Sequence, residues 1–205
     1  MLNPDSVVYT LGDNLYINLT NRCPCNCSFC LRYNGDTVGT SASLWLESEP
    51  DATQVISLLS AHDVSAYKEV VFCGYGEPTC ALEVLLDVAR WLKARGAQVR
   101  LDTNGLADLI WRQPVAPQLH GLVDTVSVSL NAADAAHYNE LCRPVFGEAA
   151  FEALQEFAVD CRQQVPQVMF SVVDVIGADE IERCRAIAER CGVGFRVRPD
   201  IKEAS

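Results

Sequence analysis

Long hydrophobic runs are missing from this 205-residue chain, in which no stretch approaches the ~18–20 apolar residues of a membrane-spanning helix. The opening residues, MLNPDSVVYTLGD, lack the basic segment and following apolar segment that mark a secretory signal. Repeats, low-complexity tracts and linkers are missing as well. We therefore expect a cytoplasmic protein without membrane contact, and residues 1–205 have the length of a single domain.

Positive charge is also scarce. The sequence holds 16 Lys and Arg residues against 27 Asp and Glu residues, which gives a formal net charge of -11. Broad binding of nucleic acid by charge requires a basic surface, so nucleic acid is not an expected partner. Because hydrophobic residues make up 49% of the chain, we expect a substantial buried core and no extended disorder.

Cysteine, in contrast, is abundant, with ten residues in the chain. In a reducing compartment, such a number indicates metal binding or buried thiols and not disulfides. Cys23, Cys27 and Cys30 stand in the order C-x3-C-x2-C within TNRCPCNCSFCLR. Three thiolates on one short loop can bind three corners of a cubane iron–sulfur cluster and leave the fourth iron without a protein ligand. An open metal position is where a substrate or cofactor binds, so this spacing predicts a metalloenzyme.

The alternative for this loop is a zinc knuckle with Cys25 as the fourth ligand. Structural zinc sites usually combine two ligand pairs separated by a longer stretch. No second CxxC or HxxxH pair follows, and the three histidines are isolated in the sequence. The sequence therefore favours the iron–sulfur cluster, with Cys25 as a surplus thiol.

The cysteines outside the loop do not form a second compact group of four. Cys161, Cys184 and Cys191 fall on the apolar faces of predicted helices, as buried thiols do. Cys142, in the sequence LCRP, is predicted to lie in a loop near the catalytic edge, where a catalytic role as a thiol is conceivable. We expect one cluster and no auxiliary cluster.

Strands and helices are predicted to alternate after an opening hairpin at residues 1–19. The hairpin joins Val7–Leu11 to Leu15–Leu19, which is the first barrel strand. Further strand-like runs follow at Glu69–Cys73, Gln98–Thr103, Thr125–Leu130, Gln167–Val175 and Val193–Val197. Apolar residues at helical spacing lie between them, as in the segment 81–95. This order predicts an α/β protein with a parallel sheet, best described as an open (β/α)6 partial TIM-type barrel. A flat doubly wound sheet is the alternative.

Polar residues and glycines gather where the predicted strands end. The cysteine loop follows the first strand, and Gly74-Tyr75-Gly76-Glu77-Pro78-Thr79 follows the second. Thr103-Asn104-Gly105 and Ser129-Leu130-Asn131 end the next two strands. In parallel α/β folds the carboxyl ends of the strands carry the active groups, so these segments are candidates for one site. Ordinary turn and capping chemistry is the alternative for each, with Thr79 as the helix cap after Glu77.

The cysteine loop and the Gly-x-Gly-Glu-Pro turn together resemble the radical S-adenosylmethionine (radical SAM) superfamily. The resemblance implies a [4Fe-4S] cluster on Cys23, Cys27 and Cys30, with S-adenosylmethionine chelating the open iron. It also implies an open barrel as the fold. Phe29, just before the last cysteine, is implied to border the adenine of S-adenosylmethionine.

The same resemblance assigns further residues to S-adenosylmethionine. Gly74, Gly76 and Glu77 are implied to hold the ammonium of its methionine portion, although Tyr75 occupies the position of one customary glycine. The strand-end residues that resemble the family's other contacts to this cofactor are Asn104, Ser129 and Asn131. Catalytic residues for the substrate are not indicated by the sequence.

Two segments extend the resemblance to a subgroup. NLYINLTNRCPCNCSFCLR and VSVSLNAADAAHYNELCRP are similar to small radical SAM proteins associated with TatD-family nucleases. The resemblance implies an enzyme that reductively cleaves S-adenosylmethionine to a 5′-deoxyadenosyl radical, which abstracts hydrogen from an unidentified substrate. A low-potential electron donor, flavodoxin or ferredoxin, is then an expected partner, and a functional association with a TatD-family nuclease is a further expectation.

The class of substrate stays open. One alternative to a small molecule is activation or modification of a protein partner, in the manner of glycyl-radical enzyme activators. A further alternative is a non-catalytic iron–sulfur or zinc-binding module.

Arginines alternate with apolar residues in the last predicted strand, VGFRVRP. Phe195 and Val197 are expected to face the helices, which would turn Arg196 and Arg198 into the barrel. A buried arginine needs an acidic neighbour or a ligand anion, and Asp102 or Asp174 could provide the former. We therefore predict that Arg198 contacts an anionic group of S-adenosylmethionine or of the substrate.

Overall fold

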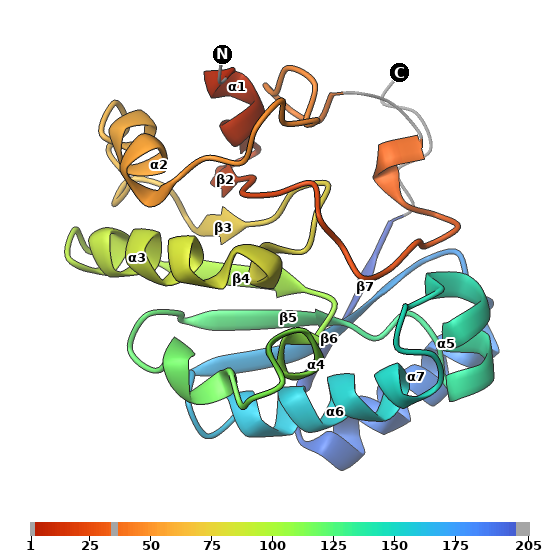
Figure 1. The fold of residues 1–205 in the computed structure, drawn as a ribbon. Helices are drawn as coiled ribbons and strands as arrows, with labels where there is room; N and C mark the ends of the chain where they lie inside the picture. The colour runs from red at the N-terminus through yellow and green to blue at the C-terminus, as the bar shows by residue number, and fades with distance from the viewer. Residues whose placement is uncertain (1–2, 34–36, 200–205) are drawn as a thin grey trace. The chain divides into compact units, whose positions relative to one another are not determined.

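The structure is a computed structural model that describes residues 3–33 and 37–199. The chain divides into two compact units. The first contains Met1–Cys23, Asp36–Asp102 and Gly121–Asp124, and the second contains Pro24–Gly35, Thr103–His120 and Thr125–Ser205. Helices and strands alternate along the chain, as Figure 1 shows.

The strands and helices have the following bounds. The strands are β1 (Val8–Leu11), β2 (Asn14–Ile17), β3 (Val70–Phe72), β4 (Val99–Thr103), β5 (Thr125–Ser129), β6 (Gln167–Val173) and β7 (Gly194–Arg198). The α-helices are α1 (Pro4–Val7), α2 (Ala52–Leu59), α3 (Leu82–Lys93), α4 (Ala107–Trp111), α5 (Ala135–Cys142), α6 (Ala149–Cys161) and α7 (Ala178–Cys191). Short 3-10 helices lie at η1 (Leu31–Tyr33), η2 (Pro78–Ala81) and η3 (Ala116–Leu119).

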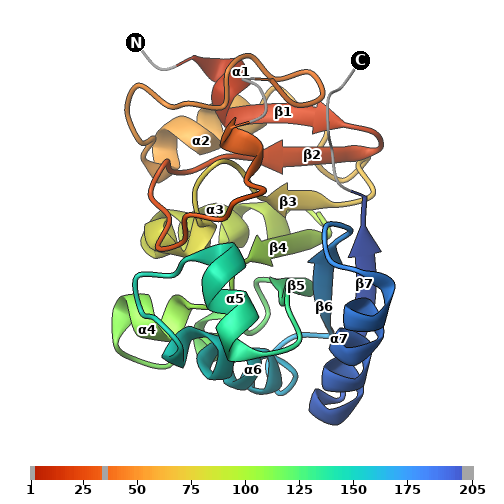
Figure 2. The same ribbon diagram turned by 90° about the vertical axis from the view of Figure 1, so that its right-hand side faces the viewer.

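The first unit contains the predicted hairpin and a parallel continuation. β1 pairs with β2 antiparallel, β2 pairs with β3 parallel, and β3 pairs with β4 parallel (Figure 2). The middle strand β3 is buried at all three positions, as expected for a parallel strand covered on both faces. α3 buries Leu85, Ala89 and Leu92, which recur at the helical spacing that the sequence predicted for the segment 81–95, and also Val88.

Polar side chains of the first unit pair with one another. The guanidinium of Arg100 on β4 lies 2.7 Å from Glu69 and 3.1 Å from Asp102, with only 8% of the arginine side chain exposed. Asp102, one of the acidic neighbours considered for Arg198, therefore forms an ion pair with Arg100. Arg100 and Asp102 alternate along β4 with the buried apolar residues Val99 and Leu101.

The second unit continues the β/α order. β5 pairs with β6 and β6 with β7, both parallel. In Figure 1, α6 and α7 run alongside these strands, and the fully buried Val128, Leu154 and Phe170 belong to the core of this unit. α7 ends at Cys191, and its C-cap Gly192 has a left-handed φ of 66°, a conformation that glycine adopts without strain.

One strand-face prediction is wrong. Val197 was expected to pack beneath the helices beside Phe195, but 37% of it is exposed. Phe195 does lie against α7, where the guanidinium carbon of Arg185 is 4.8 Å from its ring centroid. Along β7, Phe195 and Arg198 are partly buried, whereas Gly194, Arg196 and Val197 are exposed.

The periodicity of the sequence missed several short elements, namely α1, α2, α4, α5 and the 3-10 helices. α2 begins with a capping box, in which Asp51 and Gln54 exchange side-chain to backbone hydrogen bonds. α5 begins at a second acidic cap, Asp134, and buries only Tyr138 and Cys142. Helices with so few buried residues leave a weak hydrophobic pattern in the sequence.

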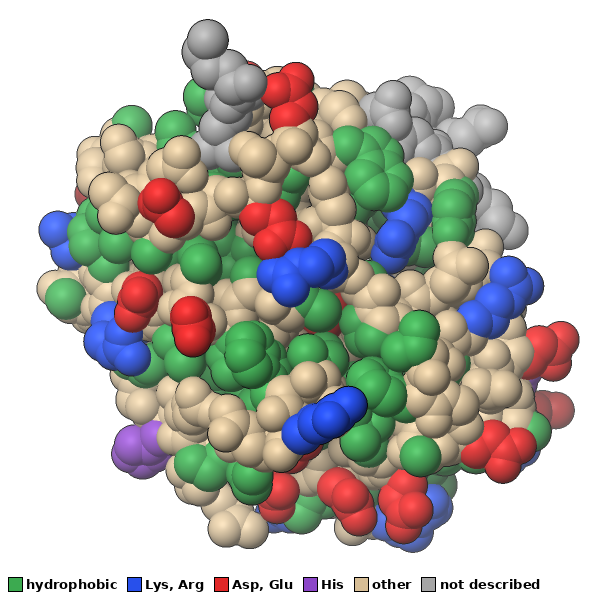
Figure 3. All heavy atoms as spheres, in the orientation of Figure 1, with side chains coloured by type: hydrophobic (Ala, Val, Ile, Leu, Met, Phe, Trp, Pro, Cys, Tyr) green, Lys and Arg blue, Asp and Glu red, His purple; other side chains and the backbone are tan. Residues whose placement is uncertain are grey.

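No helix in residues 3–33 and 37–199 is long and apolar enough to cross a membrane. The face seen in Figure 3 carries acidic and basic side chains scattered among apolar ones, without a continuous basic patch.

Candidate functional site

The turn at Gly74–Thr79 follows β3 and encloses a buried carboxylate. Only 3% of Glu77 is exposed. Its Oε1 atom accepts hydrogen bonds from the Thr79 backbone N–H at 3.1 Å and from the Thr79 hydroxyl at 2.8 Å. Glu77, and not Thr79, is therefore the N-cap of η2, which corrects the capping alternative. A carboxylate supplies the counter-charge that an ammonium group needs.

Gly74 and Gly76 of this turn pack closely against residues 18–22, which precede the cysteine loop. A Cβ atom on Gly76 would clash with the carbonyl of Thr20 and lie 2.7 Å from that of Arg22. The Glu77 N–H donates to the same Arg22 carbonyl at 2.8 Å. A Cβ on Gly74 would clash with the side chain of Asn18. Gly76 is required because backbone meets backbone there, and Gly74 because the Asn18 side chain fills the space of a Cβ. Both contacts place the turn beside the residues before Cys23.

A second segment of the same unit fixes this chain from the other side. Glu49 receives two hydrogen bonds of 2.8 Å from the guanidinium of Arg22 and one from the Thr20 hydroxyl. Asn21 exchanges hydrogen bonds with the Leu46 backbone at 2.8 and 3.1 Å. The entry to the cysteine loop is thus held rigidly by side chains that the sequence analysis did not single out.

In the second unit, the cysteine loop is tied to the end of α5. Three backbone hydrogen bonds join the segments, from Asn26 to Cys142, from Ser28 to Leu141 and from Val145 to Pro24, at 2.9–3.0 Å. Within the loop, the Cys30 N–H donates to the Cys27 carbonyl at 3.2 Å. The Arg32 Nε atom lies 3.3 Å from the Cys30 sulfur. Phe29 is half-buried in a turn between the two cysteines.

Cys27 is set up to be a thiolate. Hydrogen bonds from Cys142 and Cys25, together with the charge of Arg32, lower the pKa of Cys27 to about 4. A thiolate is the form that binds a metal. Cys142 is the last residue of α5 and 1% exposed, so its predicted position in a loop is wrong. Its contact with the cysteine loop was not predicted.

The two candidate asparagines contact thiols in the second unit. The Asn104 Nδ2 atom lies 3.7 Å from the Cys25 sulfur, and the Asn131 Nδ2 atom lies 3.9 Å from the Cys142 sulfur. Asn131 is 5% exposed and has a left-handed φ of 57°. Their assignment as contacts to S-adenosylmethionine stays a prediction, and each has an observed protein partner.

Ser129 and Arg198 meet on one face of β5–β7. The Arg198 Nη2 atom donates to the Ser129 hydroxyl at 3.2 Å, and the Arg198 Nε atom is buried without a hydrogen-bond partner. Arg198 therefore turns toward the neighbouring strands, as its alternation predicted. Arg196 is exposed.

These residues fit an iron–sulfur cluster by the chemistry of their donors. Among the described residues, no three His, Cys, Asp or Glu side chains converge on the position of a single metal ion. The three cysteines of the C-x3-C-x2-C set are included in that finding, so their assignment to a cluster rests on the spacing and chemistry of their thiols. The lowered pKa of Cys27 and the arginine at Cys30 match thiolates that bind iron.

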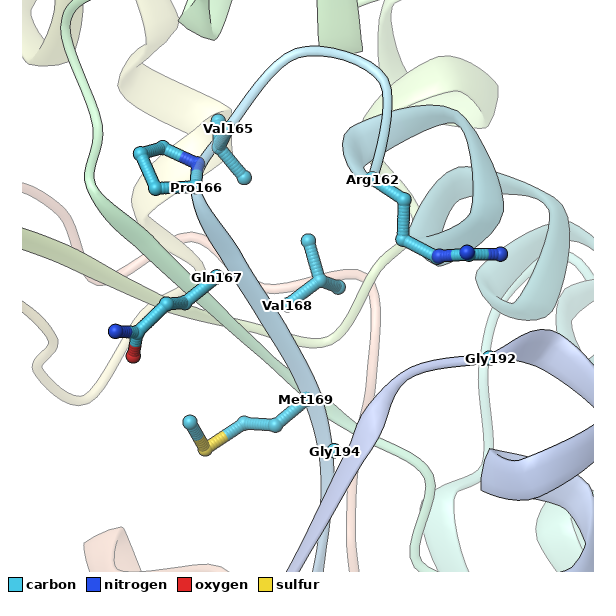
Figure 4. Close-up of a pocket in the computed structure, with 8 residues that line it drawn as sticks. All are labelled: Arg162, Val165, Pro166, Gln167, Val168, Met169, Gly192 and Gly194. Atoms are coloured by element: carbon cyan, nitrogen blue, oxygen red, sulfur yellow. The ribbon is translucent and has the colours of Figure 1, made fainter.

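A pocket of about 350 Å³ lies elsewhere in the second unit, at the amino-terminal ends of β6 and β7 (Figure 4). Its lining consists of Arg162, Val165, Pro166, Gln167, Val168, Met169, Gly192 and Gly194. In parallel α/β sheets the active groups gather at the opposite, carboxyl ends of the strands. None of the candidate residues lines this pocket.

The sequence analysis overlooked Asn18, Glu49 and Tyr138. Asn18 follows β2 directly, so the strand-end argument that selected Asn104 could have found it. Glu49 and Tyr138 carry no comparable signal, because their contacts join segments that are distant in the sequence.

An α/β chain with a thiolate loop after its first parallel strand and a buried glutamate after the second has the features of a cluster-dependent enzyme. The model of the radical SAM superfamily matches residues 17–171. The chain belongs to the radical SAM superfamily, whose enzymes use a [4Fe-4S] cluster and S-adenosylmethionine. The predictions of an enzyme and of these cofactors are confirmed at the level of the family.

Solved structures share the fold at low sequence identity. SuiB of Streptococcus suis bound to the precursor peptide SuiA has a TM-score of 0.68 and 15% identity, covering 94% of this chain and 40% of that one. TYW1 with a lysine-pyruvate adduct bound has a TM-score of 0.64 and 15% identity, with coverages of 93% and 66%. A radical SAM methyltransferase from Sphaerobacter thermophilus has a TM-score of 0.57 and 19% identity, with coverages of 94% and 57%.

These matches confirm the predicted α/β fold, an open partial barrel of TIM type. The chain spans 40–66% of the length of the three matched chains. No curated protein matches the sequence.

Proposed function

We propose that this chain generates a 5′-deoxyadenosyl radical and uses it to abstract hydrogen from a substrate. A [4Fe-4S] cluster with S-adenosylmethionine supplies the reductive cleavage that yields the radical and methionine. Cys23, Cys27 and Cys30 would hold the cluster by the spacing of their thiolates. The observation that carries the proposal is the buried Glu77 carboxylate, because its turn packs against the residues that lead into Cys23.

The chain's own residues would bind and orient the cofactor. Glu77 offers a counter-charge to the ammonium of the methionine portion, and Gly74 and Gly76 remain candidates for the same contact. The absence of a Cβ at the two glycines lets their turn pack against Asn18, Thr20 and Arg22. Phe29 remains the candidate for the adenine, and Asn104, Ser129 and Asn131 remain candidates for further contacts to S-adenosylmethionine.

The direct test is cleavage of S-adenosylmethionine by the anaerobically reconstituted protein with a strong reductant. We expect methionine and 5′-deoxyadenosine in equal amounts. Deuterated candidate substrates then identify the hydrogen donor, because their label enters 5′-deoxyadenosine. A protein that carries the intact, reducible cluster and binds S-adenosylmethionine but forms no 5′-deoxyadenosine would contradict the proposal.

The substrate is proposed to be either a small molecule or a protein partner. The latter is favoured by one observation, since SuiB was solved with a precursor peptide bound. Activation of an enzyme in the manner of glycyl-radical activators belongs to this second class. A mass change in a purified partner after turnover distinguishes it from modification of a small molecule.

The proposed reductant is an acidic flavodoxin or ferredoxin. Residues 24–33 and 141–147 contain no Asp or Glu, although the chain carries 27 of them. These two segments pair through backbone hydrogen bonds and bear Arg32 and Arg143. The cysteine loop and the segment paired with it therefore carry positive charge and no carboxylates, which supports docking of an acidic partner.

A functional association with a TatD-family nuclease is also part of the proposal. It is supported by the similarity of residues 14–32 and 126–144 to small radical SAM proteins associated with these nucleases. The two segments are joined by backbone hydrogen bonds from Asn26 to Cys142 and from Ser28 to Leu141.

The proposed location is the cytoplasm. The ten cysteines lie in the described part of the chain and none forms a disulfide, which supports this location.

Arg198→Met is expected to reduce cleavage of S-adenosylmethionine about tenfold without unfolding the protein. The guanidinium binds Ser129 and retains a buried Nε donor, which an anionic group of the cofactor or substrate would satisfy. 5′-Deoxyadenosine formation measures the effect, and Arg196→Met is the matched control because Arg196 is exposed. An equal loss of 5′-deoxyadenosine formation in both variants would contradict a specific role of Arg198. Normal cleavage of S-adenosylmethionine by Arg198→Met would mean that Arg198 contacts the substrate and not the cofactor.

A further inference from the structure

Arg22 directly precedes Cys23 in the chain, and three of its polar groups are bound within the first unit. Its guanidinium donates to both carboxylate oxygens of Glu49, from Nε to Oε1 and from Nη2 to Oε2, at 2.8 Å each. Its backbone N–H donates to the Thr20 hydroxyl at 2.9 Å. Its carbonyl accepts the hydrogen bond of the Glu77 N–H at 2.8 Å. Arg22 therefore connects the turn of Glu77 to the start of the cysteine loop.

Glu49 supplies the acceptors that keep this part of the chain in one conformation. In addition to the two hydrogen bonds from Arg22, its Oε1 atom accepts one from the hydroxyl of Thr20. The same hydroxyl is the acceptor for the Arg22 N–H, so the three residues form a closed set of hydrogen bonds. A bidentate contact between a guanidinium and a carboxylate fixes direction as well as distance. The side chain of Glu49 thus holds the backbone of residues 20–22.

The backbone of residues 20–22 is confined by two further contacts. Asn21 exchanges two hydrogen bonds with the backbone of Leu46, which lies three residues before Glu49. On the side of the turn, a Cβ atom on Gly76 would lie 2.7 Å from the Arg22 carbonyl oxygen. A turn packed this closely has to follow any displacement of Arg22. Cys23 is the next residue in the chain, so it would move as well.

The ion pair of Arg22 and Glu49 lies at the surface, where the two side chains are 60% and 36% exposed. Exposed ion pairs contribute little to the free energy of unfolding, because water screens the charges and two long side chains lose conformational freedom. The main effect of this pair is therefore expected on the local geometry of the chain. That geometry concerns a candidate cluster ligand, Cys23, and a candidate cofactor-binding carboxylate, Glu77.

We propose that Glu49 is a positioning residue, which holds Thr20 and Arg22 and thereby places Cys23 for the cluster and Glu77 for S-adenosylmethionine at the same time. This inference rests on the proposed function. Groups that orient a metal ligand from behind increase metal affinity by about ten- to hundredfold. Because both binding groups depend on one backbone segment, loss of Glu49 weakens retention of the cluster and binding of S-adenosylmethionine together.

The test measures the rate at which an iron chelator removes iron from the anaerobically reconstituted full-length protein. In Glu49→Ala we expect this rate to rise about tenfold, because Cys23 is no longer held in place. Calorimetric titration of the same cluster-loaded variant should show that S-adenosylmethionine binds several-fold more weakly. Both changes have to appear, since one backbone segment positions both groups.

Arg22→Lys distinguishes geometry from charge. Lysine keeps the positive charge but cannot form the bidentate contact with the Glu49 carboxylate. We expect iron to be lost from Arg22→Lys at a rate between those of the wild type and Glu49→Ala. A wild-type rate in Arg22→Lys would refute a role of the bidentate contact in positioning.

Asp87→Ala is the matched control, because it removes the acidic residue of another exposed ion pair in the same unit. Asp87 pairs with Arg90 on α3, and both side chains are 59% exposed. This variant should keep the wild-type rate of iron loss and the wild-type affinity for S-adenosylmethionine. Far-ultraviolet circular dichroism should show the same folded content in Glu49→Ala and Asp87→Ala, which separates positioning from general stability.

A wild-type rate of iron loss in Glu49→Ala would overturn the proposal, and so would an equal acceleration in Asp87→Ala. Faster iron loss with unchanged affinity for S-adenosylmethionine would refute the joint positioning of Cys23 and Glu77. Failure of the proposed function gives a different result, because the wild-type protein would then hold no [4Fe-4S] cluster or bind no S-adenosylmethionine. A wild type that does both, together with an unchanged Glu49→Ala, contradicts only the role of Glu49.

Discussion

Cys27→Ala is expected to remove the [4Fe-4S] cluster after anaerobic reconstitution. The remaining two thiolates of the C-x3-C-x2-C set cannot replace a third corner, and the low pKa of Cys27 marks it as a preformed thiolate. Iron and sulfide analysis should fall from about four of each per chain to background, as expected for a cluster of this type. The reduced form should lose its paramagnetic signal.

Two matched variants show whether the loss is specific. Cys161→Ala and Cys184→Ala each remove a fully buried thiol. Burial raises the pKa of both thiols above the ordinary value of cysteine, so neither is disposed to form a thiolate. Both should retain the cluster. Stoichiometric zinc in the wild type, without a visible absorption that reduction bleaches, would establish the zinc alternative in place of the cluster.

The positions of the strands were predictable because apolar runs and helical stripes repeat in β/α order. The predicted Gln98–Thr103 is β4 at Val99–Thr103, and the predicted Thr125–Leu130 is β5 at Thr125–Ser129. Strand ends also located Glu77 and the cysteine loop, because the carboxyl ends of parallel strands share one edge. Local pattern and topology were sufficient for these features.

Contacts between distant segments were not predictable in the same way. Cys142 lies 115 positions after Cys27, and nothing in LCRP indicates that the end of α5 hydrogen-bonds to the cysteine loop. Glu49 likewise binds Arg22, and no sequence pattern between the two residues predicts this contact. Such pairs depend on how the connections fold back, which hydrophobic periodicity does not encode.

The structure also separates two roles that the sequence combined. Asn104 and Asn131 were selected with Ser129 as strand-end contacts to S-adenosylmethionine. The asparagines direct their amides to thiols, whereas Ser129 binds the guanidinium of Arg198. Residues at the ends of strands can therefore contact a thiol in one case and a guanidinium in another.

Glu77→Gln is expected to weaken binding of S-adenosylmethionine by about ten- to hundredfold while the cluster content stays unchanged. A charge-assisted hydrogen bond contributes ~1.5–3 kcal/mol, which corresponds to a loss of this size. Glutamine keeps the Oε1 acceptor that binds the Thr79 N–H and hydroxyl, so the cap of η2 should survive. The substitution thus removes the charge and preserves the turn.

Calorimetric titration of the cluster-loaded protein with S-adenosylmethionine measures the loss, and Thr79→Val is the matched control. That variant removes the hydroxyl that lies 2.8 Å from Glu77 but leaves the carboxylate and the backbone N–H in place. If Glu77 binds the ammonium through its charge, Thr79→Val should lower stability by about 1 kcal/mol and change affinity only slightly. If Glu77 serves only to cap η2, affinity should be unchanged in Glu77→Gln, and the buried carboxylate would then belong to the turn alone.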